Sequence, residues 1–149
     1  MAAFEDTAGA ALLLDHQFCF ALYSASLAMT KAYQPLLAAL GLTYPQYLVM
    51  LVVWERDGMT VSEIGKRLFL DSGTLTPLIK RLESAGLIVR VRDVEDERRV
   101  RAKLTAAGRL LKSKAVDVPR CVTSKTGYEA EKLLSLNQVL RQLRKRLIG

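Results

Sequence analysis

The sequence predicts a mainly α-helical fold with one small β-hairpin, in which a helix-turn-helix is followed by a charged wing. Three observations predict it. A capping box at residues 60–63 opens a short helix, and residues 71–86 then separate their apolar and polar side chains onto two faces of a second helix. Two short segments with strand character follow, around a polar tip. Long apolar helical segments stand on both sides of this unit.

The first helical segment runs from about Leu13 to Leu40, with its apolar residues along one stripe, and stops at Gly41. Thr43 then caps a second helix that continues through Trp54, and Pro45 suits its first turn. These two segments precede the helix-turn-helix.

The second helix of the helix-turn-helix carries a surface suited to a DNA groove. Asp71 can cap it, Gly86 can close it, and Pro77 places its start at residues 72–74. Its core-facing residues are Leu75, Leu78, Ile79 and Leu82. Its outward residues are short hydroxyls followed by long cations: Ser72, Thr74, Thr76, Lys80 and Arg81. Hydroxyl groups can form hydrogen bonds with base edges and phosphates, and cations neutralise the phosphate backbone of DNA. An ordinary amphipathic surface helix would show the same pattern.

The wing and the C-terminal helices follow. Residues 87–92 and 98–104 form the hairpin, and the return strand is cationic. Thr105 caps a helix that runs towards Val116, and this helix is interrupted near residues 118–119. A last helix extends from about residue 128 to 147. The break also holds Cys121.

The charge is distributed unevenly along the 149 residues, whose net charge is +7. Residues 1–55 hold one lysine and four acidic residues, a net charge of −3, so residues 56–149 carry +10. The basic part is the part with the helix-turn-helix, which favours a polyanionic partner such as double-stranded DNA. The apolar helices at both ends favour a homodimer, whose two reading helices would meet an inverted repeat.

Two motifs resemble a known family. Asp96-x-Arg98 followed by Leu104-Thr105 resembles the wing signature of MarR-type regulators, and residues 70–78, Leu-Asp-Ser-Gly-Thr-Leu-Thr-Pro-Leu, resemble the recognition helix of the OhrR branch, the organic-hydroperoxide sensors. The resemblance implies that Arg98 enters the minor groove, held by Asp96, with Arg99 beside it on the DNA. It also implies a winged helix-turn-helix at residues 44–105, with dimerisation helices at 1–43 and 106–149.

Cys19 is the candidate sensing residue. It lies between two phenylalanines, and composition alone would make it a buried packing residue. The resemblance implies instead that an organic hydroperoxide oxidises Cys19, whose thiolate accepts hydrogen bonds from Tyr33 and Tyr44 of the opposite subunit. It also implies that Cys121 then forms an intersubunit disulfide with Cys19 and that DNA is released. Without the resemblance, the two tyrosines could be packing residues and Cys121 an unremarkable loop thiol.

The sequence therefore predicts a cytoplasmic DNA-binding transcriptional regulator, most simply a repressor, and not an enzyme. Acidic residues 5 and 6 precede the first apolar stretch, which argues against a signal peptide, and the longest apolar run is too short to span a membrane. One histidine and two cysteines fall short of a structural zinc site, and no cofactor is expected. Three alternatives remain open: a MarR-type regulator of a phenolic or apolar ligand, a thiol peroxidase, and a sequence-independent DNA-coating protein.

Overall fold

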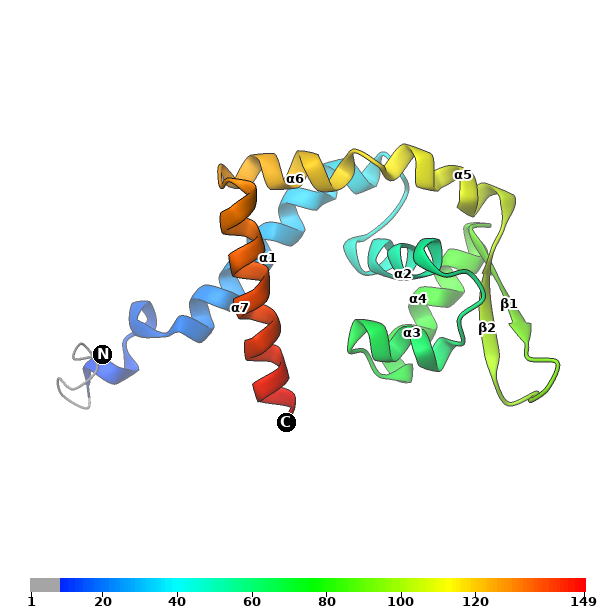
Figure 1. Ribbon diagram of the computed structural model, residues 1–149, viewed down its shortest axis with the longest axis horizontal. Helices are drawn as coiled ribbons and strands as arrows, with labels where there is room; N and C mark the ends of the chain where they lie inside the picture. The colour runs from blue at the N-terminus through cyan, green and yellow to red at the C-terminus, as the bar shows by residue number, and fades with distance from the viewer. Residues whose placement is uncertain (1–8) are drawn as a thin grey trace. The chain divides into compact units, whose positions relative to one another are not determined.

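The computed structural model describes residues 9–149 and divides the chain into two compact units, Met1–Val116 and Asp117–Gly149. The acidic residues 5 and 6 lie outside the described part. The helices of the first unit are α1 (Phe18–Ala38), α2 (Tyr44–Glu55), α3 (Val61–Leu68), α4 (Ser72–Ser84) and α5 (Ala106–Ala115), and its strands are β1 (Ile88–Arg92) and β2 (Val100–Leu104) (Figure 1). The second unit contains α6 (Val118–Thr126) and α7 (Ala130–Ile148). The predicted fold class, mainly α with a β-hairpin wing, is confirmed.

The first long helix begins later than the sequence pattern suggested. The 3-10 turn Leu14–His16 occupies the stretch predicted to open it, and a further 3-10 turn, Ala10–Leu12, precedes that stretch. Gln17 separates them from α1, because its extended backbone interrupts the helix while its side-chain amide donates to the Ala11 carbonyl oxygen at 2.6 Å and the Leu13 carbonyl oxygen at 3.0 Å. Apolar periodicity cannot detect such a side-chain cap. Gly41, with φ of 70°, follows the helix as predicted.

The helix-turn-helix forms as its caps predicted. Thr60 and Glu63 make both hydrogen bonds of the capping box, at 3.1 and 3.0 Å, and Asp71 caps α4 by accepting from the Thr74 amide at 2.8 Å. The tight turn between α3 and α4 relies on Phe69, which adopts a left-handed conformation with φ of 58°. The four apolar residues predicted to face the core are buried. Pro77 lies in the second turn of α4 rather than the first, although the helix starts at Ser72 as predicted.

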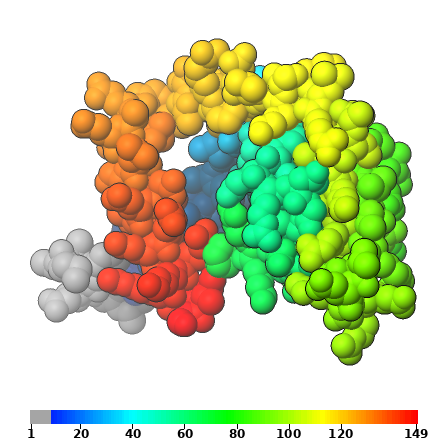
Figure 2. Space-filling model, turned by 45° about the vertical axis from the view of Figure 1, so that its right-hand side comes forward, coloured from blue at the N-terminus to red at the C-terminus, as the bar shows by residue number. Residues whose placement is uncertain are grey.

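The wing is an antiparallel hairpin attached to the loop before α3. Ile88 pairs with Leu104 and Arg90 with Ala102, while the Ala102 amide donates to the Met59 carbonyl oxygen at 2.9 Å. The second strand starts two residues later than predicted because Arg98 and its neighbour belong to the tip. In Figures 1 and 2 the tip, in yellow-green, projects beyond the helices of its own unit.

The helix after the wing is locked to α2. Thr105 caps α5 as predicted, and the Trp54 indole donates a buried hydrogen bond to the Gly108 carbonyl oxygen at 2.9 Å. A Cβ at position 108 would lie 2.1 Å from the Leu87 carbonyl oxygen, so only glycine fits this close approach.

The break predicted near residues 118–119 falls two residues earlier, at residues 116–117 between α5 and α6. Pro119 lies in the first turn of α6, where proline needs no amide partner and starts a helix rather than ending one. Cys121 is therefore a helical residue and not a loop thiol. Gly127, with φ of 69°, ends α6, and α7 follows. Among the described helices, none is long and apolar enough to cross a membrane.

Candidate DNA interface and thiol site

The outward face of α4 presents the polar residues singled out in the sequence. Ser72, Thr74, Lys80 and Arg81 are exposed and Thr76 is half-buried. The only acidic residue within α4, Glu83, is engaged by the wing: its carboxylate accepts from the Arg90 backbone amide at 2.9 Å and from the Arg90 guanidinium at 3.1 Å. The backbone hydrogen bond, followed by the guanidinium, holds the pKa of Glu83 below its ordinary value. The outward face of α4 therefore presents hydroxyls and cations, and the one carboxylate of the helix is paired with Arg90.

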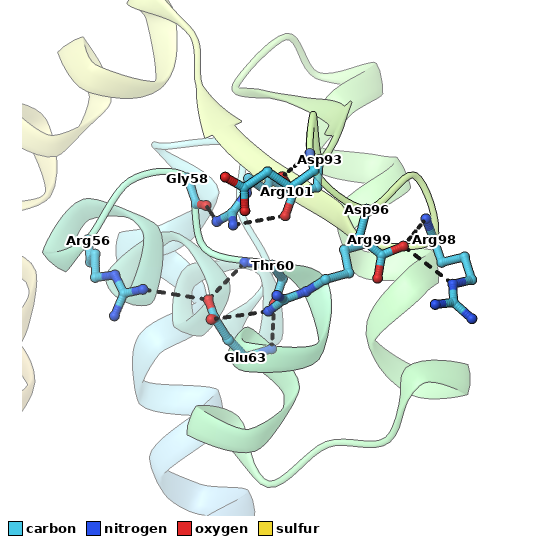
Figure 3. A network of polar contacts seen from close by, with 10 residues as sticks. Arg56, Gly58, Thr60, Glu63, Asp93, Asp96, Arg98, Arg99 and Arg101 are labelled. Atoms are coloured by element: carbon cyan, nitrogen blue, oxygen red, sulfur yellow. Dashed lines mark hydrogen bonds and ion pairs between the residues drawn. The ribbon is translucent and has the colours of Figure 1, made fainter.

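The wing tip presents Arg98 to solvent. One carboxylate oxygen of Asp96 accepts from the Arg98 backbone amide at 3.1 Å and from its Nε at 3.3 Å, while the Arg98 side chain is 92% exposed (Figure 3). Asp96 thus shapes the turn and holds the guanidinium on its outer side, the arrangement that the resemblance implied. Such an exposed ion pair adds little to the stability of the fold, so its main effect is to orient the Arg98 side chain.

Arg101, which sequence reasoning missed, holds the tip end of the hairpin against the loop before α3. Its guanidinium donates to the Gly58 carbonyl oxygen at 2.8 Å and to the Asp93 carboxylate at 3.1 Å, and the other oxygen of that carboxylate accepts from the Glu95 amide at 3.2 Å (Figure 3). The Glu95 amide, and then Arg101, lower the pKa of Asp93. We refer to Arg101, Asp93 and Gly58 as the wing clasp. Its only sequence signal is the spacing of an acid and an arginine across a hairpin, which resembles any surface pair.

Glu63 joins α3 to the wing. Besides capping Thr60, its carboxylate lies 3.7 Å from the guanidinium of Arg56 and 3.7 Å from that of Arg99 (Figure 3). The Thr60 backbone hydrogen bond is the main cause of its lowered pKa, and the arginines add to it. Arg99, one of the predicted DNA residues, is thereby directed back towards α3 instead of outward with Arg98.

Cys19 is exposed, so the composition-based expectation of a buried cysteine is wrong for the single chain. Because α1 starts at Phe18, the thiol lies in the first helical turn, where backbone amides lack helical partners and stabilise negative charge. The surrounding surface is apolar, with Phe18 66% exposed and Phe20 also exposed.

Tyr33 and Tyr44 lie in one aromatic cluster at the junction of α1 and α2. Their ring centroids are 4.8 Å apart, and Tyr47, which had no role in the sequence reading, lies 5.7 Å from Tyr33 and 6.3 Å from Tyr44. Burial, with smaller contributions from the two other phenols, raises the pKa of Tyr33 to about 12, and burial also raises the pKa of Tyr44. Both hydroxyls therefore stay protonated and able to donate near neutral pH.

The two tyrosines cannot reach the thiol of their own chain by way of α1. Cys19 and Tyr33 are fourteen positions apart on one helix, a rise of about 21 Å. The second thiol, Cys121, is exposed on α6, beside Arg120, whose guanidinium pairs with Asp117 at 2.8 Å. In the described part of the chain, no cluster of three potential metal ligands occurs.

Comparison with known proteins decides the family. The model of the SarA/Rot transcriptional regulators matches residues 31–115. An organic hydroperoxide resistance transcriptional regulator of Bacillus subtilis is 50% identical over 130 residues, which cover 87% of this chain and 88% of the relative. The chain belongs to the SarA/Rot family of transcriptional regulators. The MarR-type, OhrR-like resemblance is thereby confirmed, and the chain is a regulator and not an enzyme.

Further proteins that are similar to this SarA/Rot regulator support the same family assignment. The regulator TtmR of Methylorubrum extorquens is 52% identical over 134 residues, covering 90% of this chain and 69% of TtmR. The structure of reduced AbfR bound to DNA is 34% identical, with a TM-score of 0.76 over 91% of this chain and 95% of AbfR. A disulfide form of AbfR is 35% identical, with a TM-score of 0.63 over 87% of this chain and 91% of AbfR.

Proposed function

We propose that this regulator binds DNA as a homodimer and senses organic hydroperoxides through Cys19, with an intersubunit disulfide to Cys121 releasing the DNA. The observation that carries the proposal is an exposed thiol in the first turn of α1, with Tyr33 about 21 Å further along the same helix and Tyr44, on α2, packed against Tyr33. The names of the B. subtilis relative and of the reduced and disulfide forms of AbfR support it.

A second copy of the chain completes the site. In a two-fold interface, residue i meets residue j of the partner and the reverse contact recurs. Antiparallel pairing of two α1 helices around residue 26, midway between positions 19 and 33, sets Cys19 against the partner's Tyr33. Ser26 occupies that midpoint on the same face of α1 as positions 19 and 33, and its small side chain allows the helices to approach closely. The exposed apolar residues of α1 and α7 supply the remaining surface to bury.

The proposed chemistry is a two-electron oxidation. The Cys19 thiolate attacks one oxygen of the hydroperoxide, the O–O bond breaks, and an alkoxide leaves as a sulfenic acid forms on sulfur. The alkoxide takes a proton and departs as an alcohol. The Cys121 thiol of the partner then attacks the sulfenic sulfur, forming the disulfide and releasing water. Tyrosine donors stabilise the thiolate, and the exposed phenylalanines favour an apolar oxidant over hydrogen peroxide.

Oxidation changes DNA binding by changing the relative positions of the two subunits. The α carbons of a disulfide lie about 5.5 Å apart, so the bond fixes α1 of one subunit against α6 of the other. In the reduced dimer, two α4 helices about 34 Å apart read an inverted repeat from successive major grooves, while Arg98 enters the flanking minor groove. Residues 44–105 bind the DNA, and residues 1–43 and 106–149 form the dimer. A protein that combines DNA binding with reduced thiols works in the cytoplasm.

The test measures fluorescence anisotropy on a labelled duplex from its own promoter at fixed salt, before and after one equivalent of cumene hydroperoxide. The wild type should release the duplex and rebind it after dithiothreitol, whereas Cys19→Ser should stay bound. Cys121→Ser should be oxidised but form no intersubunit dimer on a non-reducing gel. Unchanged binding after oxidation of the wild type would leave a ligand-responsive regulator as the better account. Steady turnover with a thiol reductant would favour the peroxidase.

A further inference from the structure

A pocket of about 250 Å³ lies between the recognition helix, the start of α3 and the wing. Ser62 and Thr76 line its helical side, and Arg90, Arg98 and Arg99 line its wing side. Ile79 contributes an apolar surface between them. Of these residues, Ser62 and Arg90 had no role in the sequence prediction.

The arginines of this pocket are held by carboxylates that do not line it. Glu83 binds the Arg90 guanidinium at 3.1 Å from α4, and Glu63 approaches that of Arg99 at 3.7 Å from α3. Within residues 9–149, no carboxylate contributes to the lining. Each guanidinium has five donor groups, so a pair with one carboxylate leaves donors available. The pocket is therefore lined by residues that carry hydroxyl and guanidinium donors, a donor set that suits a phosphate oxygen.

The position of the pocket identifies the phosphate, if the proposed DNA function holds. With α4 in the major groove and Arg98 in the minor groove, the sugar–phosphate strand that separates the two grooves must pass between the helix and the hairpin. That strand crosses the mouth of the pocket. We propose that Ser62, Arg90 and Arg99 bind one phosphodiester of this strand in each half-site, and so set the register of the helix and the wing on the duplex.

The contact is a positioning contact, because phosphates carry no base sequence. Its loss should weaken binding to every duplex by a similar factor, whereas a change in Thr74 or Arg81 on the outward face of α4 should alter sequence preference. Arg90 and Lys103 provide a matched pair of cations. Arg90 lies on β1 and lines the pocket, whereas Lys103, on β2, is exposed and does not line it.

The experiment combines protein variants with altered DNA. Duplexes carrying a single neutral methylphosphonate at successive positions are titrated with reduced wild type, Ser62→Ala, Arg90→Gln and Lys103→Gln. One position per half-site should cost the wild type roughly tenfold in affinity, and cost Ser62→Ala and Arg90→Gln much less, because their phosphate contact is already weakened. Arg90→Gln should also reduce the salt dependence by about 1.8 in the log–log slope, because the dimer loses one cation in each half-site.

Two results would overturn the assignment. Equal methylphosphonate profiles for wild type, Ser62→Ala and Arg90→Gln would show that no phosphate depends on the pocket. An equal loss of slope in Lys103→Gln would show that only overall charge matters. Both leave the proposed function intact, because the wild type still prefers its inverted repeat and still responds to hydroperoxide. If the wild type shows no preference over random duplex, the DNA function itself is wrong.

Discussion

The wing clasp makes a quantitative prediction about how the wing reaches DNA. Replacing Arg101 by Met keeps an unbranched apolar stem of similar length to the arginine's aliphatic part and removes both hydrogen bonds, to the Gly58 carbonyl and the Asp93 carboxylate. Bonds to charged groups contribute about 1.5–3 kcal/mol when buried. Asp93 is 12% exposed and Arg101 31% exposed, so water compensates part of the loss and about 1–2 kcal/mol remains. The midpoint of thermal unfolding should fall by about 3–8 °C.

The same change should weaken DNA binding through Arg98, although Arg101 itself makes no DNA contact in the proposed complex. A loosened hairpin directs Arg98 less well, so Arg101→Met should lose up to the full effect of Arg98→Ala, about tenfold. The double variant should lose no more than Arg98→Ala alone, because both changes remove one interaction. Anisotropy on the inverted repeat measures these affinities, with Lys103→Met as the control. Additive losses in the double variant would refute the reasoning.

Three further predictions follow from named contacts. Tyr33→Phe and Tyr44→Phe should each slow oxidation of Cys19 by about tenfold in stopped-flow with cumene hydroperoxide, without changing the DNA affinity of the reduced protein; equal rates would remove the tyrosines from the site. Gly108→Ala should cost more than 3 kcal/mol, because its Cβ would lie 2.1 Å from a carbonyl oxygen, and urea unfolding with Ala107→Gly as reference checks this. Glu63 has a lowered folded pKa, so its stabilisation is present above the unfolded value near 4.5 and is lost as pH falls through the folded value. Acid unfolding of Glu63→Gln should therefore show a weaker pH dependence than wild type, and identical curves would exclude the carboxylate as a source of stability.

The three tyrosines of the aromatic cluster can be read from the sequence, but their contacts and the raised pKa of Tyr33 depend on the tertiary structure. The sequence supplies three tyrosines at positions 33, 44 and 47, and only the packing of α1 on α2 brings their rings within 4.8–6.3 Å. That burial raises the pKa of Tyr33, which no local pattern reveals, because the effect depends on residues distant in sequence.

The sequence by itself determined the helix-turn-helix and which polar residues lie on the outward face of α4. Caps such as Thr60 with Glu63, and the apolar period from Leu75 to Leu82, act within a few residues, so they can be recognised without tertiary information. The Asp96–Arg98 turn is local for the same reason. Residue roles in the thiol site came from family resemblance and not from the pattern, and they remain proposals.

The tertiary structure alone decided where the chain departs from these periodicities. The amide of Gln17 ends the 3-10 turns and so sets Cys19 in a first helical turn, and Cys121 lies within α6, whose first turn contains Pro119, and not in the break before that helix. The wing clasp and the pocket beside it join α3, the hairpin and the loop before α3, which lie far apart along the chain. In the sequence, the residues of the clasp and the pocket look like ordinary surface charges. The interactions between them form only when segments that are distant in sequence come together in the fold.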